Sequence, residues 1–470
     1  PTDTGCRVCH AVSTNGAALL TQRAREVNGS KTNLDYGASS LFELTTGTGD
    51  ILMPNGGGAS VYSWPAIYPD GTFLFSNSWT HNYNISDFAN VWMTANSGTA
   101  SGLYPIPPNT AGLTTTNLPA GLHAACPAFS PDGKHLAFNF SSGSAGGLTG
   151  DGVSLASCDF KLMPGGLANF SNFKNLFTPG MLNGHQETAV WPSFLPSAST
   201  TSAADAGADG GAGGPASVAF EVEVKTNGRD FAGTRAACDL GSTMPDGFTP
   251  CTEPATHDGA QGELWWVDLD TQTSYPLYAL NGKTLNGNTV TSYLPTNAGT
   301  EHPDDTVLNF EPTVNPVPSG GYAWVVFTSR RLYGNVATVN PYFSDPRFHD
   351  ISQTPTTKKL WVAAIDLNAP PGTDPSHPAF YLPAQELLAG NSRGFWVVDP
   401  CKQDGNGCET GDECCGGFCR PNGDAGALVC STTKPSCSNV SEKCSTTADC
   451  CEAAEGVACI GGFCSTLTPK

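Results

Sequence analysis

The chain has 470 residues, of which 22 are Lys or Arg and 42 are Asp or Glu, so its formal net charge is −20. Binding to nucleic acid or to an anionic membrane surface requires clustered cations, and this balance argues against both partners. Charged residues make up only 14% of the chain, whereas Gly (54) and Pro (36) are abundant, which indicates strands joined by turns rather than a helical bundle.

Near the N-terminus, Cys6, Cys9 and His10 form a C-x-x-C-H motif. This spacing is typical of covalent c-type haem attachment, in which two thiols bond to the haem vinyl groups and the histidine becomes the proximal iron ligand. The other 16 of the 18 cysteines form an even set, so this motif stands apart from them. We therefore expect one covalent haem c per chain. The alternative is a local Cys6–Cys9 disulfide beside a surface histidine.

A short pattern recurs along the chain and is clearest at residues 126–138. Alternating apolar residues lead into a Ser-Pro-Asp-Gly turn and out of it again, which predicts a tight β-hairpin. A good copy lies at residues 64–75, a weaker one at residues 9–20, and degenerate ones begin at Trp191 and Glu311. A repeat of this size, built from short strands, predicts an all-β fold and a β-propeller in particular.

Further apolar segments supply the outer strands of each predicted blade. They lie at residues 41–44 and 51–53 for blade one, 91–94 and 103–106 for blade two, 160–163 and 175–177 for blade three, 218–222, 264–269 and 275–278 for blade four, and 322–327 and 360–365 for blade five. Residues 377–383 fit either the outer strand of blade five or the opening strand of a sixth. Residues 394–398 either close the ring or lead away from it. Five blades are clear and six are possible.

The hairpins resemble the repeats of TolB-type propellers, whose units read as an aromatic residue, Ser-Pro-Asp-Gly and an apolar strand. Residues 126–138 match this pattern closely and residues 64–75 match it well. The resemblance covers residues 9 to about 398 and implies a propeller but no activity, because the fold hosts scaffolds and enzymes alike. We predict a propeller domain over residues 1–398, carrying the haem motif in its first blade. The Ala-, Gly- and Ser-rich residues 197–217 are expected to form a flexible insertion.

Cysteine usage predicts the compartment. Twelve cysteines lie from Cys401 onward, which indicates disulfides and hence a secreted, cell-surface or periplasmic protein, in a bacterium. Within the predicted propeller we expect the disulfides Cys126–Cys158 and Cys238–Cys251. No apolar run is long enough for a transmembrane helix. The chain begins at Pro1 without a signal peptide, which we interpret as a processed N-terminus.

The C-terminal cysteines divide into two sets of six, each with a central Cys-Cys pair, over residues 399–432 and 433–470. Spacing alone permits fifteen disulfide connectivities for each set. Both sets resemble knottins, small inhibitor cystine-knot modules, and zinc clusters are the alternative. The resemblance implies pairing of the first cysteine with the fourth, the second with the fifth and the third with the sixth. The implied pairs are Cys401–Cys415, Cys408–Cys419, Cys414–Cys430, Cys437–Cys451, Cys444–Cys459 and Cys450–Cys464.

The second axial ligand would decide what such a haem does. Our candidates, in order, are His377, His185 and His123, because each lies just before an expected strand start near the channel mouth. A sixth ligand gives an electron carrier, whereas an open site permits peroxidase-like chemistry. We therefore expect a monohaem c-type cytochrome that passes electrons to a partner protein or a neighbouring subunit, with self-assembly as one route. The alternative is a secreted or cell-surface binding or structural protein without a redox role.

Overall fold

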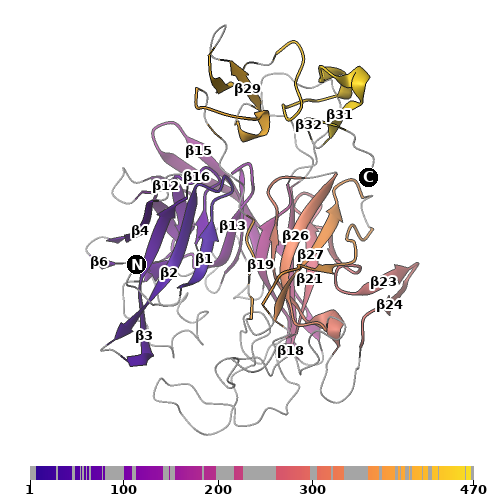
Figure 1. Cartoon of the computed structure of the whole chain (residues 1–470). Helices are drawn as coiled ribbons and strands as arrows, with labels where there is room; N and C mark the ends of the chain where they lie inside the picture. The colour runs from indigo at the N-terminus through magenta and orange to yellow at the C-terminus, as the bar shows by residue number, and fades with distance from the viewer. Residues whose placement is uncertain are drawn as a thin grey trace. The chain divides into compact units, whose positions relative to one another are not determined.

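The structure is a computed structural model (Figure 1). It describes residues 7–27, 30–44, 48–52, 54–55, 58–59, 61–62, 65–76, 78–79, 100–107, 113–140, 148, 154–182, 185–196, 216–225, 261–296, 304–318, 321–332, 358–369, 373–386, 390–391, 393–396, 402, 405–414, 417–421, 426–431, 433, 435–460 and 462–466. Contacts divide the chain into two units. The first comprises residues 1–196, 215–317 and 323–397, and the second comprises residues 197–214, 318–322 and 398–470.

The first unit is an all-β propeller of five blades, each a sheet whose strands pair largely in chain order (Figure 1). Blade one contains β1 (Arg7–Val12), β2 (Ala18–Val27), β3 (Ser30–Glu43) and β4 (Thr48–Leu52), and blade two contains β8 (Ala66–Ile67), β9 (Phe73–Ser76) and β11 (Gly102–Pro105). Blade three contains β13 (Ala124–Phe129), β14 (His135–Phe140), β15 (Leu155–Met163), β16 (Leu167–Phe177) and β12 (Thr114–Thr116), which pairs with β16 in parallel. Blade four contains β19 (Thr188–Phe194), β20 (Ser217–Lys225), β21 (Gln261–Asp268) and β22 (Ser274–Pro276), and blade five contains β25 (Asn309–Val314), β26 (Tyr322–Ser329), β27 (Lys359–Asp366) and β28 (Phe380–Tyr381).

The structure changes one strand assignment that the sequence predicted and decides one that the sequence left open. In blade two, β11 pairs directly with β9, so the segment expected as the fourth strand lies beside the second one, and residues 91–94 lie outside the described residues. The ambiguous residues 377–383 contain β28, which pairs with β27 and is the outer strand of blade five. They do not open a sixth blade.

The predicted turn chemistry is present in the first three hairpins. In blade three, the Gly133 N–H donates to the Ser130 carbonyl (2.9 Å), and Gly133 has φ +70°. Gly71 and Gly16 make the same contact to Tyr68 and Ser13, also with positive φ. Glycine adopts this left-handed conformation without the steric cost that other residues bear, which is why the repeat keeps it at the end of the turn.

Apolar cores lie between successive blades rather than at a single centre. Blades one and two share Leu20, Leu41, Tyr62 and Leu74, and blades two and three share an aromatic cluster around Phe73, Phe138 and Phe170. Blades three and four pack through Leu155, Phe194 and Phe220, and blades four and five pack through Leu264, Phe327 and Trp361. Burial of this apolar surface is the main term that holds sheet against sheet.

Short elements accompany the blades. They are the pairs β5 (Pro54–Asn55) with β6 (Gly58–Ala59), β7 (Val61–Tyr62) with β10 (Ser78–Trp79), β17 (Met181–Leu182) with β18 (His185–Gln186) and β23 (Lys283–Asn286) with β24 (Thr289–Ser292), and the 3₁₀ turn η1 (Asp305–Val307). All eight strand residues of the β23–β24 hairpin are intermediate or exposed, so it contributes little to the core.

The second unit contains the two cysteine-rich modules. Module 1 has η2 (Gly411–Glu413) and the hairpin β29 (Phe418–Pro421) with β30 (Leu428–Ser431). Module 2 repeats this order with η3 (Thr447–Asp449), η4 (Ala453–Glu455) and the hairpin β31 (Val457–Ile460) with β32 (Phe463–Thr466). The shared order of elements indicates that the two modules are copies of one small fold.

Candidate functional site

The C-x-x-C-H motif lies on the inner strand of the first blade. Cys9 and His10 belong to β1, of which the structure describes the backbone at these two positions, and Cys6 lies outside the described residues. The pairing of β1 with β2 shifts register between Val8 and Ala11, so Cys9 and His10 form a β-bulge. A bulge leaves its residues out of the regular ladder and re-aims their side chains.

The bulge recurs at the same place in three other blades. Register shifts fall between Ala125 and Ala128, between Val190 and Ser193, and between Phe310 and Thr313. The first bulged residue has positive φ in each: 45° for Cys126, 54° for Trp191 and 53° for Glu311. The backbone therefore places Cys9-His10 at the position that Cys126-Pro127, Trp191-Pro192 and Glu311-Pro312 hold in their blades.

Arg393, which precedes no strand of the five blades, also has positive φ (+43°). Its N–H donates to Thr328 Oγ1 (3.0 Å), as the Glu311 N–H donates to Glu221 Oε2 (2.8 Å). Thr328 and Glu221 occupy equivalent positions in their blades. The residues that follow the two bulges, Thr313 and Ser193, pair with Val326 and Ala219. Thr328 and Glu221 each lie two residues beyond these partners. Residues 393–396, named here the closing segment, therefore lie where the inner strand of a sixth blade would begin.

A cavity of about 110 Å³ lies on the propeller axis. It is lined by residues 11–14, 65–67, 127–129, 192–194 and 313–314 of the five inner strands and by Arg393, Phe395 and Trp396 of the closing segment. Trp396 Nε1 donates to the Thr313 carbonyl (2.9 Å), and the Arg393 guanidinium lies over the Trp191 ring (4.4 Å). The closing segment thus forms part of the wall of the central channel.

The three candidate distal histidines do not share one position. His123 is half-buried and directly precedes β13, and His185 begins β18, just before β19. Both therefore lie near the start of an inner strand, as expected. His377 does not: it is exposed, and its N–H donates to the Ala364 carbonyl of β27 (2.9 Å). It lies beside β27, the third strand of blade five, and so away from the inner strand β25, where the sequence analysis expected it.

Buried carboxylates near the channel were not anticipated from sequence. Glu221, Glu223 and Glu311 are at most 3% exposed. Burial raises the pKa of Glu221 well above its usual range, and the nearby Glu223 and Glu311 carboxylates raise it further. Glutamate at alternate positions of a strand resembles a solvated face, so nothing in the sequence marked these residues as interior.

A second buried polar cluster supports the start of blade five. The Arg331 side chain donates from Nε to Asn309 Oδ1 (3.1 Å) and from Nη2 to the Leu280 carbonyl (2.9 Å). Burial lowers its pKa to about 10, and burial raises the pKa of Asp305, in η1, to about 7. The hydrogen bonds of Arg331 run to neighbouring loops and strands, so we assign this cluster to the fold.

The propeller cysteines differ from the expectation. Cys126 and Cys158 are free and buried, so the disulfide expected between them is not formed. Cys126 lies on β13 and Cys158 on β15, with β14 between them. Two strand spacings amount to about 10 Å, beyond the roughly 7 Å that a disulfide can span between Cα atoms. The expected pair Cys238–Cys251 lies outside the described residues.

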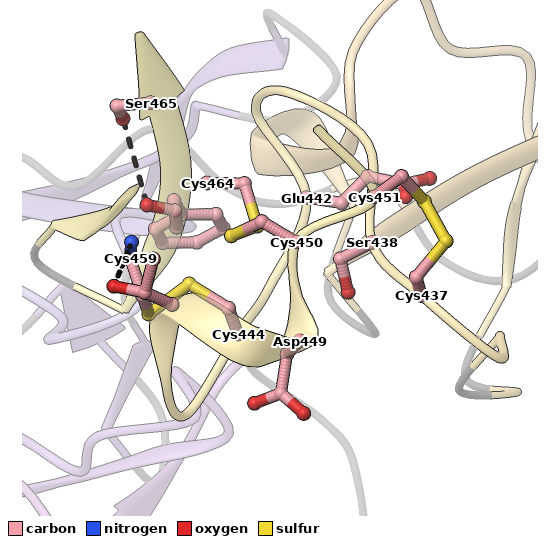
Figure 2. The surroundings of a disulfide bond; sticks show 12 residues. Cys437, Ser438, Glu442, Cys444, Asp449, Cys450, Cys451, Cys459, Cys464 and Ser465 are labelled. Carbon is pink, nitrogen blue, oxygen red and sulfur yellow. Dashed lines mark hydrogen bonds between the residues drawn. A yellow bond between two sulfur atoms is a disulfide. The ribbon is translucent and has the colours of Figure 1, made fainter. Parts of the chain in front are cut away.

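The cysteine-rich modules hold five disulfides within the described residues. They are Cys408–Cys419, Cys414–Cys430, Cys437–Cys451, Cys444–Cys459 and Cys450–Cys464, the last three of which Figure 2 shows. These are the pairs that the knottin resemblance implies. Cys401 and Cys415 lie outside the described residues. The two groups of clustered thiol sulfurs, around Cys414 and Cys450, belong to these disulfides, so they are not zinc ligands here.

A buried ion pair joins the two modules. Glu442 of module 2 is 2% exposed and accepts a hydrogen bond from Arg420 Nη2 of module 1 (2.5 Å). The Lys443 N–H donates to the Gly417 carbonyl (2.9 Å), where a Cβ on Gly417 would lie 2.6 Å from that of Lys443. The modules therefore pack as one body through side-chain and backbone contacts.

Comparison with known proteins extends no further than the fold. No protein-family model and no curated protein matches the chain. Similar solved structures include an oligogalacturonate lyase in complex with manganese (11% identity, 78% of this chain and 74% of that chain, TM-score 0.33). Others are a protein assigned as TolB from Agrobacterium tumefaciens (15%, 83% and 86%, TM-score 0.33) and the Dos1 propeller (12%, 81% and 86%, TM-score 0.32). Of these three, only the Dos1 structure is named as a propeller, and all three similarities are low.

The location of the protein follows in outline from its disulfides. Structural disulfides of this density are typical of oxidising compartments, which fits an extracellular or periplasmic protein. In the part of the chain that the structure describes, no helix is long and apolar enough to cross a membrane.

Proposed function

We propose that this propeller is the scaffold of an extracytoplasmic monohaem c-type cytochrome. The observation that carries the proposal is the C-x-x-C-H motif, whose Cys9 and His10 coincide with the bulge of β1. In the other blades the second bulged residue is proline, as in Cys126-Pro127 and Trp191-Pro192. Blade one replaces that proline with histidine, which is the residue that a haem iron requires at this spacing.

Each residue of the motif has a distinct role in the proposal. The thiols of Cys6 and Cys9 bind the haem covalently, and His10 supplies the proximal nitrogen ligand. The bound haem would supply one-electron transfer. His123 and His185 are the remaining distal candidates, because they precede inner strands, whereas His377 lies at the outer edge of its blade.

One haem per chain limits the activity to single-electron exchange with a neighbour. We propose a redox partner protein or a second copy of this chain as that neighbour. A peroxidase-like enzyme would instead require iron with an open coordination position. Binding of carbon monoxide to the ferrous protein separates these two uses of the same haem.

The test is the visible spectrum of the purified protein, oxidised and dithionite-reduced, with a pyridine haemochrome assay on the denatured chain. A c-type α-band that stays with the polypeptide after acid–acetone extraction is the expected result. The Cys6→Ser/Cys9→Ser double variant should lose the bound haem, whereas the Cys126→Ser variant should keep it. Covalent haem in the double variant, or a colourless parent, contradicts the proposal.

A second candidate is a binding protein without redox activity. It is favoured by the central cavity, which all five inner strands and the closing segment line, and by the paired modules, whose disulfides make them rigid recognition units. In this case Cys6 and Cys9 form a disulfide. A colourless protein with an intact Cys6–Cys9 bond, detected by peptide mass mapping, would establish this candidate over the first.

A further inference from the structure

One β-hairpin stands apart from the sheets of the propeller. Among the strands that the structure describes, β23 and β24 pair only with each other, and Figure 1 shows the hairpin projecting from the propeller. Leu285 and Val290 pair across it and are 40% and 43% exposed. At the tip, a Cβ on Gly287 would meet no atom within 4 Å. A two-stranded hairpin is at most marginally stable by itself in water, so a further strand would stabilise it.

The base of the hairpin is fixed to the propeller. Tyr293 Oη donates to the Ala279 carbonyl (2.5 Å), and Lys283 forms an ion pair with Glu263 of β21. Contacts with blade four therefore set the position of the hairpin, while its two strands stay in water.

One edge of β24 is open to pairing. The Tyr293 N–H donates to the Gly282 carbonyl (2.9 Å), so the backbone of Tyr293 is directed at β23. The direction alternates along an antiparallel strand, so Thr291 also bonds to β23, whereas Val290 and Ser292 direct their N–H and C=O groups outward. No strand of the described residues pairs with that edge. A row of such groups is a template for another strand.

The outer strands of the blades are protected against such pairing, and β24 is not. β11 and β22 contain Pro105 and Pro276, and β4 contains Asp50. β12 and β28 are three and two residues long. Proline, charge and short length are usual means of blocking an exposed edge. The sequence of β24, Thr-Val-Thr-Ser, has four uncharged and mostly β-branched residues and none of these devices.

The charge of the chain favours a second copy as the partner at this edge. Two copies with a net charge of −20 each repel one another over most of their surface. At β24 no like charges would oppose each other, because Lys283, the one charged residue of the two strands, lies on β23 and is paired with Glu263. Thr and Val side chains also favour strand pairing. The edge therefore fits its own copy both in charge and in side-chain type.

We propose that β24 pairs with β24 of a second copy, antiparallel and about a two-fold axis at Thr291. In this register the outward N–H and C=O groups of Val290 meet those of Ser292 of the second copy, and the reverse. The two hairpins then form one four-stranded sheet, with the two Thr291 side chains directly opposite each other. Two-fold contacts of this kind are by far the commonest in protein dimers. The inference goes beyond the proposed function, because the pairing needs no haem.

The contact is small, which sets the strength that we expect. Four strand residues from each copy bury less than the roughly 1,600 Å² of a standard interface. We therefore expect a weak dimer, measured by sedimentation equilibrium at concentrations up to about 1 mM. Added salt screens the repulsion between two copies of net charge −20, so association should strengthen as the ionic strength rises.

Charge at Thr291 tests the register. Thr291→Lys and Thr291→Glu each place like charges opposite each other across the two-fold axis, and each should weaken self-association about tenfold or more. An equimolar mixture of the two variants places Lys opposite Glu and should recover a one-to-one dimer at least as strong as that of the parent. Misfolding does not imitate this result, because recovery in the mixture needs a folded hairpin in both variants.

Thr284 offers the matched control. It lies on β23, pairs with Thr291 within the hairpin, and is exposed as Thr291 is. Thr284→Lys and Thr284→Glu place the same charges on the same face but one strand farther from the axis, and should leave association close to that of the parent. The Cys6→Ser/Cys9→Ser variant should also associate as the parent does, so this proposal and the haem proposal fail separately.

A parent dimer that is lost in both Thr291 variants and recovered in their mixture supports the inference. A parent that stays monomeric at the highest concentration and salt overturns it. A dimer that the Thr291 variants leave intact also overturns it, because the copies then meet elsewhere. Equal losses in the Thr284 and Thr291 variants overturn the proposed register and the inference with it.

Discussion

Single residues at the turns and bulges explain much of this chain. The first three hairpins reuse a glycine with positive φ at the turn, and the inner strands β1, β13, β19 and β25 each carry a bulge. Where the bulged residue is not glycine, as in Trp191 and Glu311, the surrounding hydrogen bonds hold the strained backbone in place. Positive φ recurs at Arg393, which begins the closing segment.

Substitution of Gly133 tests whether the hairpin turn of blade three also contributes to the contact with blade two. A Cβ on Gly133 would lie 2.5 Å from Tyr68 Oη, whereas one on Gly165, which also has positive φ, would meet no atom within 4 Å. Both alanine variants should lose about 1–2 kcal/mol from the backbone conformation alone. Gly133→Ala should lose about 1–3 kcal/mol more, because Tyr68 must move. Equal losses in thermal or urea unfolding would show that the Tyr68 contact is unimportant.

Glu221 should make the stability of the propeller dependent on pH. Its pKa is raised in the folded state by burial and by Glu223 and Glu311, so folded protein holds this proton to higher pH than unfolded chain does. The stability contribution is complete below the unfolded pKa of about 4.3 and is lost as pH rises through the folded pKa.

Glu221→Gln removes this titration. The variant should therefore match the parent near pH 4 and unfold at a higher temperature than the parent at alkaline pH. Calorimetry between pH 4 and 9 measures the difference, with Asp270→Asn as an exposed carboxylate control that leaves the profile unchanged. A parallel fall of parent and Glu221→Gln with pH would assign the dependence to other groups.

At the scale of elements, the modules show how a fold too small for a large core is stabilised. Each has a two-stranded hairpin, short 3₁₀ turns and disulfides in place of an apolar centre. Units of this size rarely bury enough apolar surface to fold without such cross-links. The Arg420–Glu442 pair then joins the two copies.

Arg420→Ala should separate the modules. Glu442 is 2% exposed, and loss of its partner leaves its buried carboxylate with hydrogen bonds, among the described residues, only from the Asn439 and Cys419 N–H groups, which costs about 1–3 kcal/mol. Hydrogen exchange should increase at the Cys419 and Lys443 amides, which lie at the module contact, while the disulfides stay intact. Lys402→Ala, which breaks the exposed Lys402–Glu413 pair, is the control and should have little effect. Unchanged exchange in Arg420→Ala would show that backbone contacts suffice.

At the scale of the whole molecule, the propeller and the modules are stabilised by different kinds of interaction. The propeller buries apolar side chains between its blades and gathers one segment from each around a central cavity. The modules depend on covalent cross-links that form only in an oxidising compartment. A c-type haem is also attached outside the cytoplasm in the proposal, so the two features are compatible within one chain.

The sequence by itself determined the class of fold, because its evidence is local. Alternating apolar residues, Ser-Pro-Asp-Gly turns and evenly spaced cysteines each act over a few residues, and so they predict hairpins, blades and module boundaries. The order of strands in blades three, four and five follows the predicted segments. The C-x-x-C-H motif is local in the same sense, and its role stays a prediction.

Only the tertiary structure decided which distant residues meet. It placed a strand between Cys126 and Cys158, put His377 at the outer edge of blade five, and buried Glu221 and Arg331. It also placed the closing segment, one of two roles that the sequence allowed for residues 394–398, in the wall of the central cavity. Each of these outcomes depends on packing between segments that lie far apart in the chain. Strand register, the neighbouring blades and burial decide what surrounds a side chain there, and a short stretch of sequence contains no information on them.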